Sequence, residues 1–344
     1  MNPLQPHSLH LSAVRRWLTF SLLLVVLMVA LGGVTRLTES GLSIVEWKLV
    51  SGTLPPLGDA AWQEEFDAYK TSPQYEQVNR GFSLSDFKQI FWLEYLHRLL
   101  GRFIGFVVAG GTLYYGARRF LPRALLLRML WISALVGAQG AVGWIMVASG
   151  LENEPRVEPI KLALHLLLAF SVFGALLWTR WQVLGACAQK ASAGIYWAVR
   201  ALLALVTAQI FLGALVAGLR AGLTYNTYPL MDGQFIPEGL HLLTPWWKNH
   251  FENVMTVQFQ HRMGALTVAA ATLGFVAYGW RKLPTGLLQW LLVALVLQFG
   301  LGVATLLSVV ELWLASAHQL VALLLTGLLL QICYLTRRKT HNQG

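Results

Sequence analysis

The sequence predicts an all-α integral membrane protein with eight transmembrane helices, arranged as two four-helix bundles. Three observations lead to this prediction. The chain has 344 residues, of which 56% are hydrophobic and 12% charged, whereas soluble domains carry roughly a quarter charged residues. Eight apolar stretches are long enough to cross a bilayer. Four histidines also recur at matched places in the two halves of the chain.

Each expected span has about 17–25 apolar residues, the length that a bilayer requires. The first follows a polar tail of about fourteen residues and precedes no small-residue cleavage site, so we expect it to be retained rather than removed as a signal peptide. The expected spans are Trp17–Thr35, Leu96–Ala117, Leu125–Ala148, Leu162–Trp181, Ile195–Leu219, Val257–Trp280, Leu287–Val309 and Leu312–Leu335.

The distribution of charge predicts the orientation of these spans. All sixteen acidic residues fall in alternate loops or at the adjacent helix ends, and basic clusters without acidic residues occupy the other side. This is the positive-inside pattern, with both termini in the cytoplasm. The short N-terminal tail lacks the features of a mitochondrial presequence, which favours a bacterial inner membrane. The net charge of +10 therefore indicates topology and not nucleic-acid binding. The basic clusters are Arg15–Arg16, Arg118–Arg128, Arg180–Arg200, Arg281–Lys282 and Arg337–Lys339.

An internal repeat predicts two halves, residues 1–190 and residues 191–344. Each half has an even number of spans, so both enter the membrane in the same orientation and are related by a pseudo-two-fold axis along the membrane normal. Val34-Thr35-Arg36 is echoed by Gly218-Leu219-Arg220, and Gln139–Gly143 by Gln298–Gly302. Gln209 and Gly213 repeat the same spacing, and such Gln and Gly residues favour close helix packing.

The four repeated histidines are His97, His165, His261 and His318. All lie at the outer side of inward-running spans, and a buried imidazole needs a partner. Zinc takes three or four protein ligands, whereas a porphyrin iron needs only axial ligands. One histidine pair in each half therefore predicts two hemes and four metal ligands. Satisfied core histidines, a shared four-histidine site and a di-iron site are alternatives, the last requiring two Glu-x-x-His motifs.

One carboxylate breaks the symmetry of the repeat. Glu94 lies three residues before His97 on the same helix face, and Gln258 stands at the matching position. We predict that the heme beside Glu94 undergoes chemistry while the other is retained. Glu94 can accept a proton or stabilise positive charge that develops on a substrate. The alternative is a helix N-terminal acid favoured by the helix dipole.

Arginines gather at the outer helix ends, where they are candidate partners for heme propionates because guanidinium groups bind carboxylates well. Interfacial snorkelling is the alternative. The candidates are Arg36, Arg98, Arg220 and Arg262, with Arg102 nearby. Two long outer loops, residues 37–93 and 221–256, are expected to cover a functional site because of their length and apolar content, and Trp62–Lys70 is helix-like.

Several motifs together resemble the heme A synthase family over nearly the whole chain. They are Gly32–Ser43, Pro55-Pro56, the segment from Phe91-Trp92 to His97-Arg98, and Asn226–Gly233. The long first loop has no cysteine, which resembles the proteobacterial and mitochondrial branch rather than the branch with a cysteine pair there.

The resemblance implies an oxidoreductase that converts the C8 methyl of heme O to the formyl group of heme A for cytochrome c oxidase. It implies substrate heme between His97 and His165 with Glu94 beside it, and a permanent heme b between His261 and His318. The implied partners are heme O synthase, cytochrome c oxidase assembly factors, an electron acceptor and membrane lipid, with a homo-oligomer left open. A non-catalytic di-heme electron carrier and a heme transporter are the rival functions.

Overall fold

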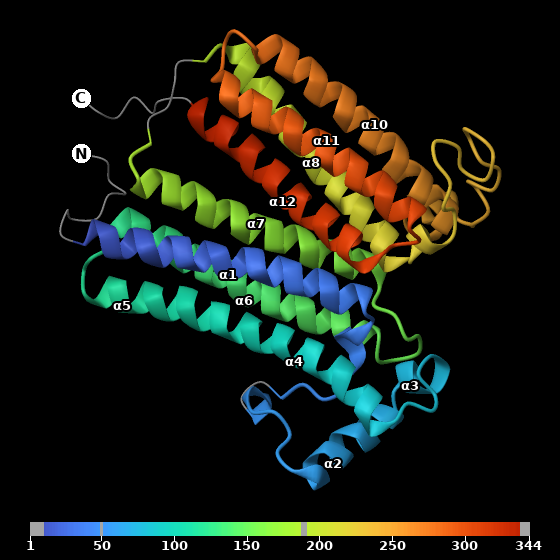
Figure 1. The fold of residues 1–344 in the computed structure, drawn as a ribbon. Helices are drawn as coiled ribbons and strands as arrows, with labels where there is room; N and C mark the ends of the chain where they lie inside the picture. The colour runs from blue at the N-terminus through green and yellow to red at the C-terminus, as the bar shows by residue number, and fades with distance from the viewer. Residues whose placement is uncertain (1–9, 49–50, 187–190, 338–344) are drawn as a thin grey trace.

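The computed structural model describes residues 10–48, 51–186 and 191–337, and apart from one isolated bridge its regular structure there is helical. Figure 1 shows long helices lying side by side along one direction. They are α1 (Leu11–Leu37), α4 (Leu84–Gly105) with η3 (Phe106–Gly110) and α5 (Gly111–Ala117), α6 (Arg123–Ser149), α7 (Pro159–Val183), α8 (Ala193–Gly218), α10 (Val254–Gly279), α11 (Thr285–Leu307) and α12 (Leu312–Leu335).

Seven spans in the described residues are long and apolar enough to cross a membrane, which confirms an α-helical, multi-pass membrane protein. Only 6–39% of the apolar window of each is buried in the protein, so most of this surface faces outward as lipid-facing surface does. The helix α10 has 26 residues but is not among the seven. Its first turns carry Gln258, Gln260, His261 and Arg262, which lower its hydropathy.

The long helices pack as two groups (Figure 1). In the first helix group, α1 and α6 each pack against both α4 and α7. In the second helix group, α8 and α11 each pack against both α10 and α12. Each group has its own apolar core, around Met129 and Ile132 in the first and Leu288 and Leu291 in the second. The groups meet where α7 packs on α8 and α12, and where α1 packs on α12. The expected boundary at Lys190 lies outside the described residues.

The second expected span was wrong at its outer end, since α4 begins at Leu84 rather than near Leu96. A capping box starts the helix there: the Asp86 backbone N–H donates to Ser83 Oγ (3.2 Å), and the Ser83 N–H donates to the Asp86 carboxylate (2.9 Å). The expected span marked only the apolar part of a helix that extends outward by about three further turns. Glu94 and His97 therefore lie well inside α4.

A π-helical turn, η3, interrupts the same helix after His97. Within this turn the Val107 carbonyl also accepts a hydrogen bond from the Trp17 indole of α1 (2.9 Å). The corresponding helix of the second group, α10, is a continuous α-helix. The two groups thus differ in the helix that carries their first histidine.

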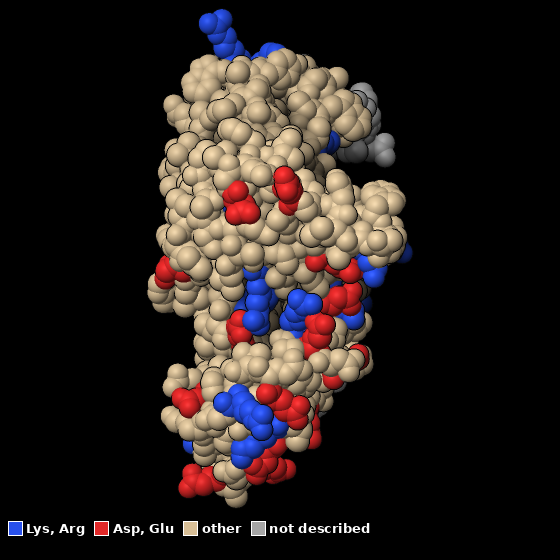
Figure 2. All heavy atoms as spheres, turned by 90° about the vertical axis from the view of Figure 1, so that its right-hand side faces the viewer, with Lys and Arg blue, Asp and Glu red and all other residues tan. Residues whose placement is uncertain are grey.

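The outer loops cover one end of the helix groups. The first contains η1 (Ser40–Leu42), η2 (Ser51–Thr53), α2 (Asp59–Lys70) and α3 (Pro73–Gln77), so the predicted helix over Trp62–Lys70 is confirmed. Aromatic side chains of α2 pack on those of α4, with Trp62 and Phe66 against Phe87 and Phe91. The other long loop contains η4 (Ala221–Leu223), η5 (Trp246–Lys248) and α9 (Asn249–Glu252). Figure 2 faces this end and shows acidic side chains next to basic ones.

Candidate functional site

The structure brings the predicted histidine pairs together. His97 is on α4 and His165 on α7, two helices that face each other across the first group, and the two imidazoles lie within electrostatic range. His261 on α10 and His318 on α12 have the same relation in the second group. No cluster of three or more His, Cys, Asp or Glu that suits a metal occurs in the described residues. The shared four-histidine site and the di-iron site, which need such a cluster, do not fit.

Each imidazole packs against a glycine of a neighbouring helix. A Cβ atom placed on Gly143 of α6 would lie 2.8 Å from His165 Cε1, and one on Gly302 of α11 would lie 2.8 Å from His318 Cε1. The corresponding distances are 3.0 Å from Gly213 of α8 to His261 Cε1 and 3.2 Å from Gly32 of α1 to His97 Nε2. The glycines thus leave the space that the rings occupy, in addition to allowing close helix packing.

Glutamine amides hold three of the four imidazoles. Gln139 Nε2 lies 3.2 Å from His165 Nε2, Gln209 Nε2 lies 3.0 Å from His261 Nδ1, and Gln298 Nε2 lies 3.3 Å from His318 Nε2. From the sequence these glutamines were expected to serve helix packing, and their contacts with the histidine rings were not predicted. Their position four residues before a glycine that faces a histidine is the signal that could have identified it.

The donor set of each pair fits a porphyrin iron. The Nδ1 atoms of His165 and His318 are buried and have no hydrogen-bond partner among the described atoms. A metal ion that binds the lone pair of such an imidazole nitrogen would supply the partner that the atom lacks. Two imidazoles from facing helices supply the two axial ligands that a heme iron takes from a protein.

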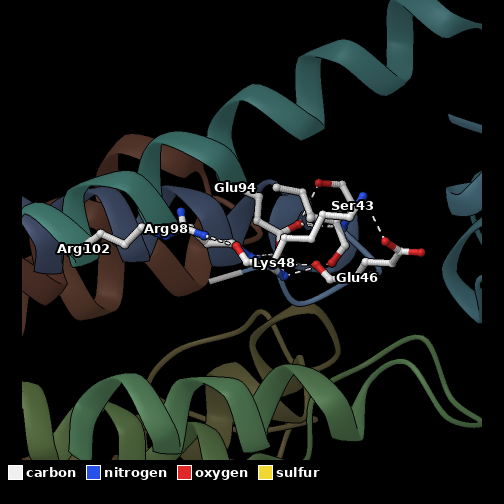
Figure 3. A network of polar contacts seen from close by, with 7 residues as sticks. Ser43, Glu46, Lys48, Glu94, Arg98 and Arg102 are labelled. Atoms are coloured by element: carbon white, nitrogen blue, oxygen red, sulfur yellow. Dashed lines mark hydrogen bonds and ion pairs between the residues drawn. The ribbon is translucent and has the colours of Figure 1, made fainter. Parts of the chain in front are cut away.

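The Glu94 carboxylate is buried, with 2% of the residue exposed, and accepts five hydrogen bonds (Figure 3). Oε2 accepts from the Ser43 N–H (2.7 Å), the Ser43 hydroxyl (2.7 Å) and the Ile44 N–H (2.9 Å). Oε1 accepts from Arg98 Nη2 (2.6 Å) and Nε (2.9 Å). The dipole interpretation is wrong, because Glu94 is not in the first turn of α4. The network fixes the loop after α1 onto α4, and this role of Ser43 was not predicted from the sequence.

The Arg98 side of this network borders a cavity of about 220 Å³ under the first outer loop. Its charged lining includes Glu46, Lys48, Glu65, Arg98 and Arg102. Lys48 donates to Glu65 (3.1 Å) and is 2.9 Å from Glu46, and these contacts raise the pKa of Lys48. The cavity places polar groups next to the Glu94–Arg98 ion pair.

The second group repeats this network with an amide in place of the carboxylate. Gln258 is equally buried, and its Nε2 donates to the Ala221 carbonyl (2.8 Å) while its Oε1 accepts from Arg262 Nη2 (3.1 Å). Arg262 also donates to the carbonyls of Tyr225 (2.7 Å) and Thr227 (2.8 Å). These match the bonds from Arg98 to the carbonyls of Ile44 (2.9 Å) and Glu46 (3.5 Å).

Arg36 and Arg220 join the two helix groups at their outer ends. Arg36 Nη2 donates to the Ala217 carbonyl at the end of α8 (2.7 Å), and Arg220 forms an ion pair with Glu39 (3.0 Å). Glu39 and Arg220 both have left-handed backbone, with φ of 56° and 53°, and each begins a 3-10 turn. The structural counterpart of Arg220 is therefore Glu39, and the predicted echo between Arg36 and Arg220 was three residues out of register.

The four candidate arginines differ in whether their guanidinium donors already have hydrogen-bond partners in the protein. The Nε atoms of Arg36, Arg220 and Arg262 are buried and have no hydrogen-bond partner among the described atoms. Arg98 instead gives both Nε and Nη2 to Glu94. A carboxylate ligand would therefore find a free N–H donor on Arg36, Arg220 and Arg262. Arg98 already uses two of its donor nitrogens to bind Glu94.

A helical membrane protein with two matched histidine sites is the class that the fold and the sites define. Residues 15–330 match the COX15-CtaA family, described as cytochrome oxidase assembly protein, and the chain belongs to this family. It is 51% identical to the heme A synthase of Bradyrhizobium diazoefficiens, over 90% of this chain and 88% of the relative. It is 48% identical to that of Rhodopseudomonas palustris (95% and 92%) and 46% identical to that of Parvibaculum lavamentivorans (92% and 92%).

Proposed function

We propose that this chain is a heme A synthase, a membrane oxidoreductase that converts the C8 methyl of heme O to the formyl group of heme A for cytochrome c oxidase. The relatives that carry this name match the chain over nearly its whole length. One structural observation carries the proposal: two histidine pairs occupy matching sites, and only one of them has a carboxylate, Glu94, on the same helix as its first histidine. The electrons released pass to an electron acceptor.

The N-terminal half, residues 1–190, is proposed to bind heme O and its product between His97 and His165. The C-terminal half, residues 191–344, is proposed to bind a resident heme b between His261 and His318. When bound, the heme irons supply the redox chemistry. The facing helices, the glycines that make room for the rings and the unpartnered ring nitrogens support this assignment.

The halves are proposed to be a parallel repeat of four spans each, with α10 as the eighth span. Three observations support this. The order of helix packing is the same in both groups. Arg98 and Arg262 make the same carbonyl contacts at matching loop positions. Glu39 and Arg220, which are structural counterparts, form an ion pair with each other, as residues beside a two-fold axis do.

Glu94 is proposed to act electrostatically, since positive charge that develops on the oxidised methyl is stabilised by a fixed nearby carboxylate. All five donors hold Glu94 as a hydrogen-bond acceptor, which suits this role better than proton transfer, because a protonated oxygen would have to give up a donor. Arg36, Arg220 and Arg262 are the better candidates for heme propionates, because each keeps a buried, unpartnered Nε.

The proposed location is the bacterial inner membrane, with both termini cytoplasmic and the heme sites toward the periplasm. The described starts of α1 and α8 and the ends of α7 and α12 lie at one end of the molecule, and the long loops lie at the other (Figure 1). Heme O synthase, assembly factors of cytochrome c oxidase and membrane lipid are the proposed partners.

Pyridine hemochrome analysis of the purified protein tests the function. The protein is expressed with and without heme O synthase, and a formyl-bearing heme is expected only when the synthase is present. Two bound hemes with no formyl product under either condition would instead support the alternative of a di-heme electron carrier, which the near-equivalence of the two sites favours.

Glu94→Gln tests the role of the carboxylate. The variant is expected to lose turnover and to keep both hemes, whereas Ser43→Ala, which removes one donor and keeps the charge, is expected to retain most turnover. If Glu94→Gln loses heme in proportion to its activity, Glu94 only holds the loop in place.

A further inference from the structure

The four imidazoles are not held equally. Amides of Gln139, Gln209 and Gln298 reach the rings of His165, His261 and His318, and the first two amides also donate to the backbone carbonyl of the same histidine (3.1 and 2.8 Å). No described residue makes a hydrogen bond to the His97 ring. One histidine of the first group therefore lacks the tether that both histidines of the second group have.

Met28 occupies the place where His97 would have its glutamine. Gly32 of α1 and Gly213 of α8 both face the first histidine of their group, and Met28 and Gln209 each lie four residues before that glycine. Both side chains reach the following helix just inward of the histidine. Met28 Cε lies 3.3 Å from a Cβ placed on Gly101 of α4, and Gln209 Oε1 lies against Gly264 of α10. A thioether thus replaces an amide at equivalent positions.

A second difference between the groups lies on α4, the helix that carries His97. The π turn η3 follows His97 in α4, whereas α10 continues as α-helix after His261. π turns in helices are frequent at functional sites. The neighbouring surface of α1 and α4 is apolar and exposed at Phe20, Leu27 and Phe103, so it faces lipid.

We propose that His97 is the exchangeable ligand of the first site and that Gln139, Gln209 and Gln298 are positioning residues for the other three histidines. This inference rests on the proposed function, since it requires heme at both sites. Substrate heme remains on His165 and enters or leaves on the His97 side, next to α1 and α4, while the resident heme is held by two tethered imidazoles.

The chemistry of the amide explains why it serves as a tether. An amide carries both a donor and an acceptor, so it can pair with an imidazole nitrogen in either tautomer. The Oε1 atoms of all three glutamines are buried and unpartnered among the described atoms, which leaves the acceptor available. Groups that orient a metal-bound histidine typically change metal affinity by about 10- to 100-fold when they are mutated. Met28 offers only a weak acceptor.

Met28→Gln tests the proposal by adding the missing amide. The full-length protein is purified from cells that make heme O, and transfer of heme to excess apomyoglobin is followed in detergent, with heme O, heme A and heme b resolved by chromatography. We expect loss of heme O and heme A to slow by about 10-fold or more, while loss of heme b is unchanged. Met28→Leu is the matched control and should release heme at the wild-type rate. Equal rates for Met28→Gln and Met28→Leu would overturn the proposal.

The reciprocal variant, Gln209→Met, should accelerate heme b loss by about 10- to 100-fold and broaden its low-spin ferric spectrum. Helix content by circular dichroism separates this effect from misfolding, and retention of heme O and heme A provides an internal control. A Gln209→Met protein that keeps heme b as firmly as the wild type would contradict the tethering role. Because heme loss is measured without turnover, failure of this proposal is distinct from failure of the proposed function, which shows as the absence of a formyl-bearing heme product.

Discussion

Replacing Gly302 by alanine is expected to displace the His318 ring and to weaken binding of heme b in the second site. The added Cβ would lie 2.8 Å from His318 Cε1, 3.4 Å from Nδ1 and 3.5 Å from Nε2. Ordinary contacts begin near 3.4 Å, so the ring must move by about 0.6 Å, or α11 and α12 must separate. Overpacking of this kind costs about 1–3 kcal/mol. Ligand positions must hold to about 0.5 Å, so the displacement alone is enough to disturb an axial ligand.

Gly300→Ala is the matched control on the same helix, because a Cβ there has nothing within 4 Å. It should bind heme b normally and unfold at a slightly higher temperature, since alanine favours a helix over glycine by about 1 kcal/mol. Heme b per protein and the absorption spectrum of the oxidised and reduced protein are measured for both variants, and we expect about 10- to 100-fold weaker binding for Gly302→Ala. Equal heme content and identical spectra in the two variants would refute the assignment of Gly302 as the space for the His318 ring.

Three further predictions concern the elements that support the sites. Trp17→Phe removes the indole hydrogen bond to the π turn and should lower stability by about 1–3 kcal/mol in thermal unfolding, without changing heme b content. The contacts of Lys48 with Glu46 and Glu65 raise its pKa, so they stabilise the folded protein below about pH 10.5, and this stabilisation is lost as the pH rises through the raised pKa. Lys48→Met should therefore flatten the alkaline part of a plot of melting temperature against pH, with an effect of less than about 1 kcal/mol. Asn249→Ala removes three backbone contacts from a side chain that is 1% exposed and should make the loop before α10 sensitive to protease, unlike the wild type.

The sequence predicted the histidine pairs because each pair repeats the same neighbours, and the helix geometry places repeated residues at equivalent points. Hydropathy alone did not predict the outer end of α4, because Leu84–Leu93 is amphipathic and packs under a loop rather than in lipid. The capping pattern of Ser83 and Asp86 was nevertheless present in the sequence.

The glutamine contacts could not be predicted from spacing. Whether Gln139 faces a neighbouring backbone or the His165 ring depends on the rotation of α6 and on which helices are adjacent, and both follow only from tertiary packing. The repeat register near Arg36 failed for a related reason. Like residues were aligned, whereas the shared feature is a left-handed turn that holds Glu39 in one half and Arg220 in the other.

Three differences between the two groups lie close to the histidine sites. The loop-holding arginines and the glycines beneath the rings are equivalent, so they explain why two sites exist and not why the sites differ. Glu94 in the first group corresponds to Gln258 in the second, and Met28 corresponds to Gln209. The π turn in α4 corresponds to continuous α-helix in α10. All three differences lie on α4 or on the helix that packs against it. A site that both reacts and releases its product needs a charge and a looser ligand, and the proposals assign these two features to the first group.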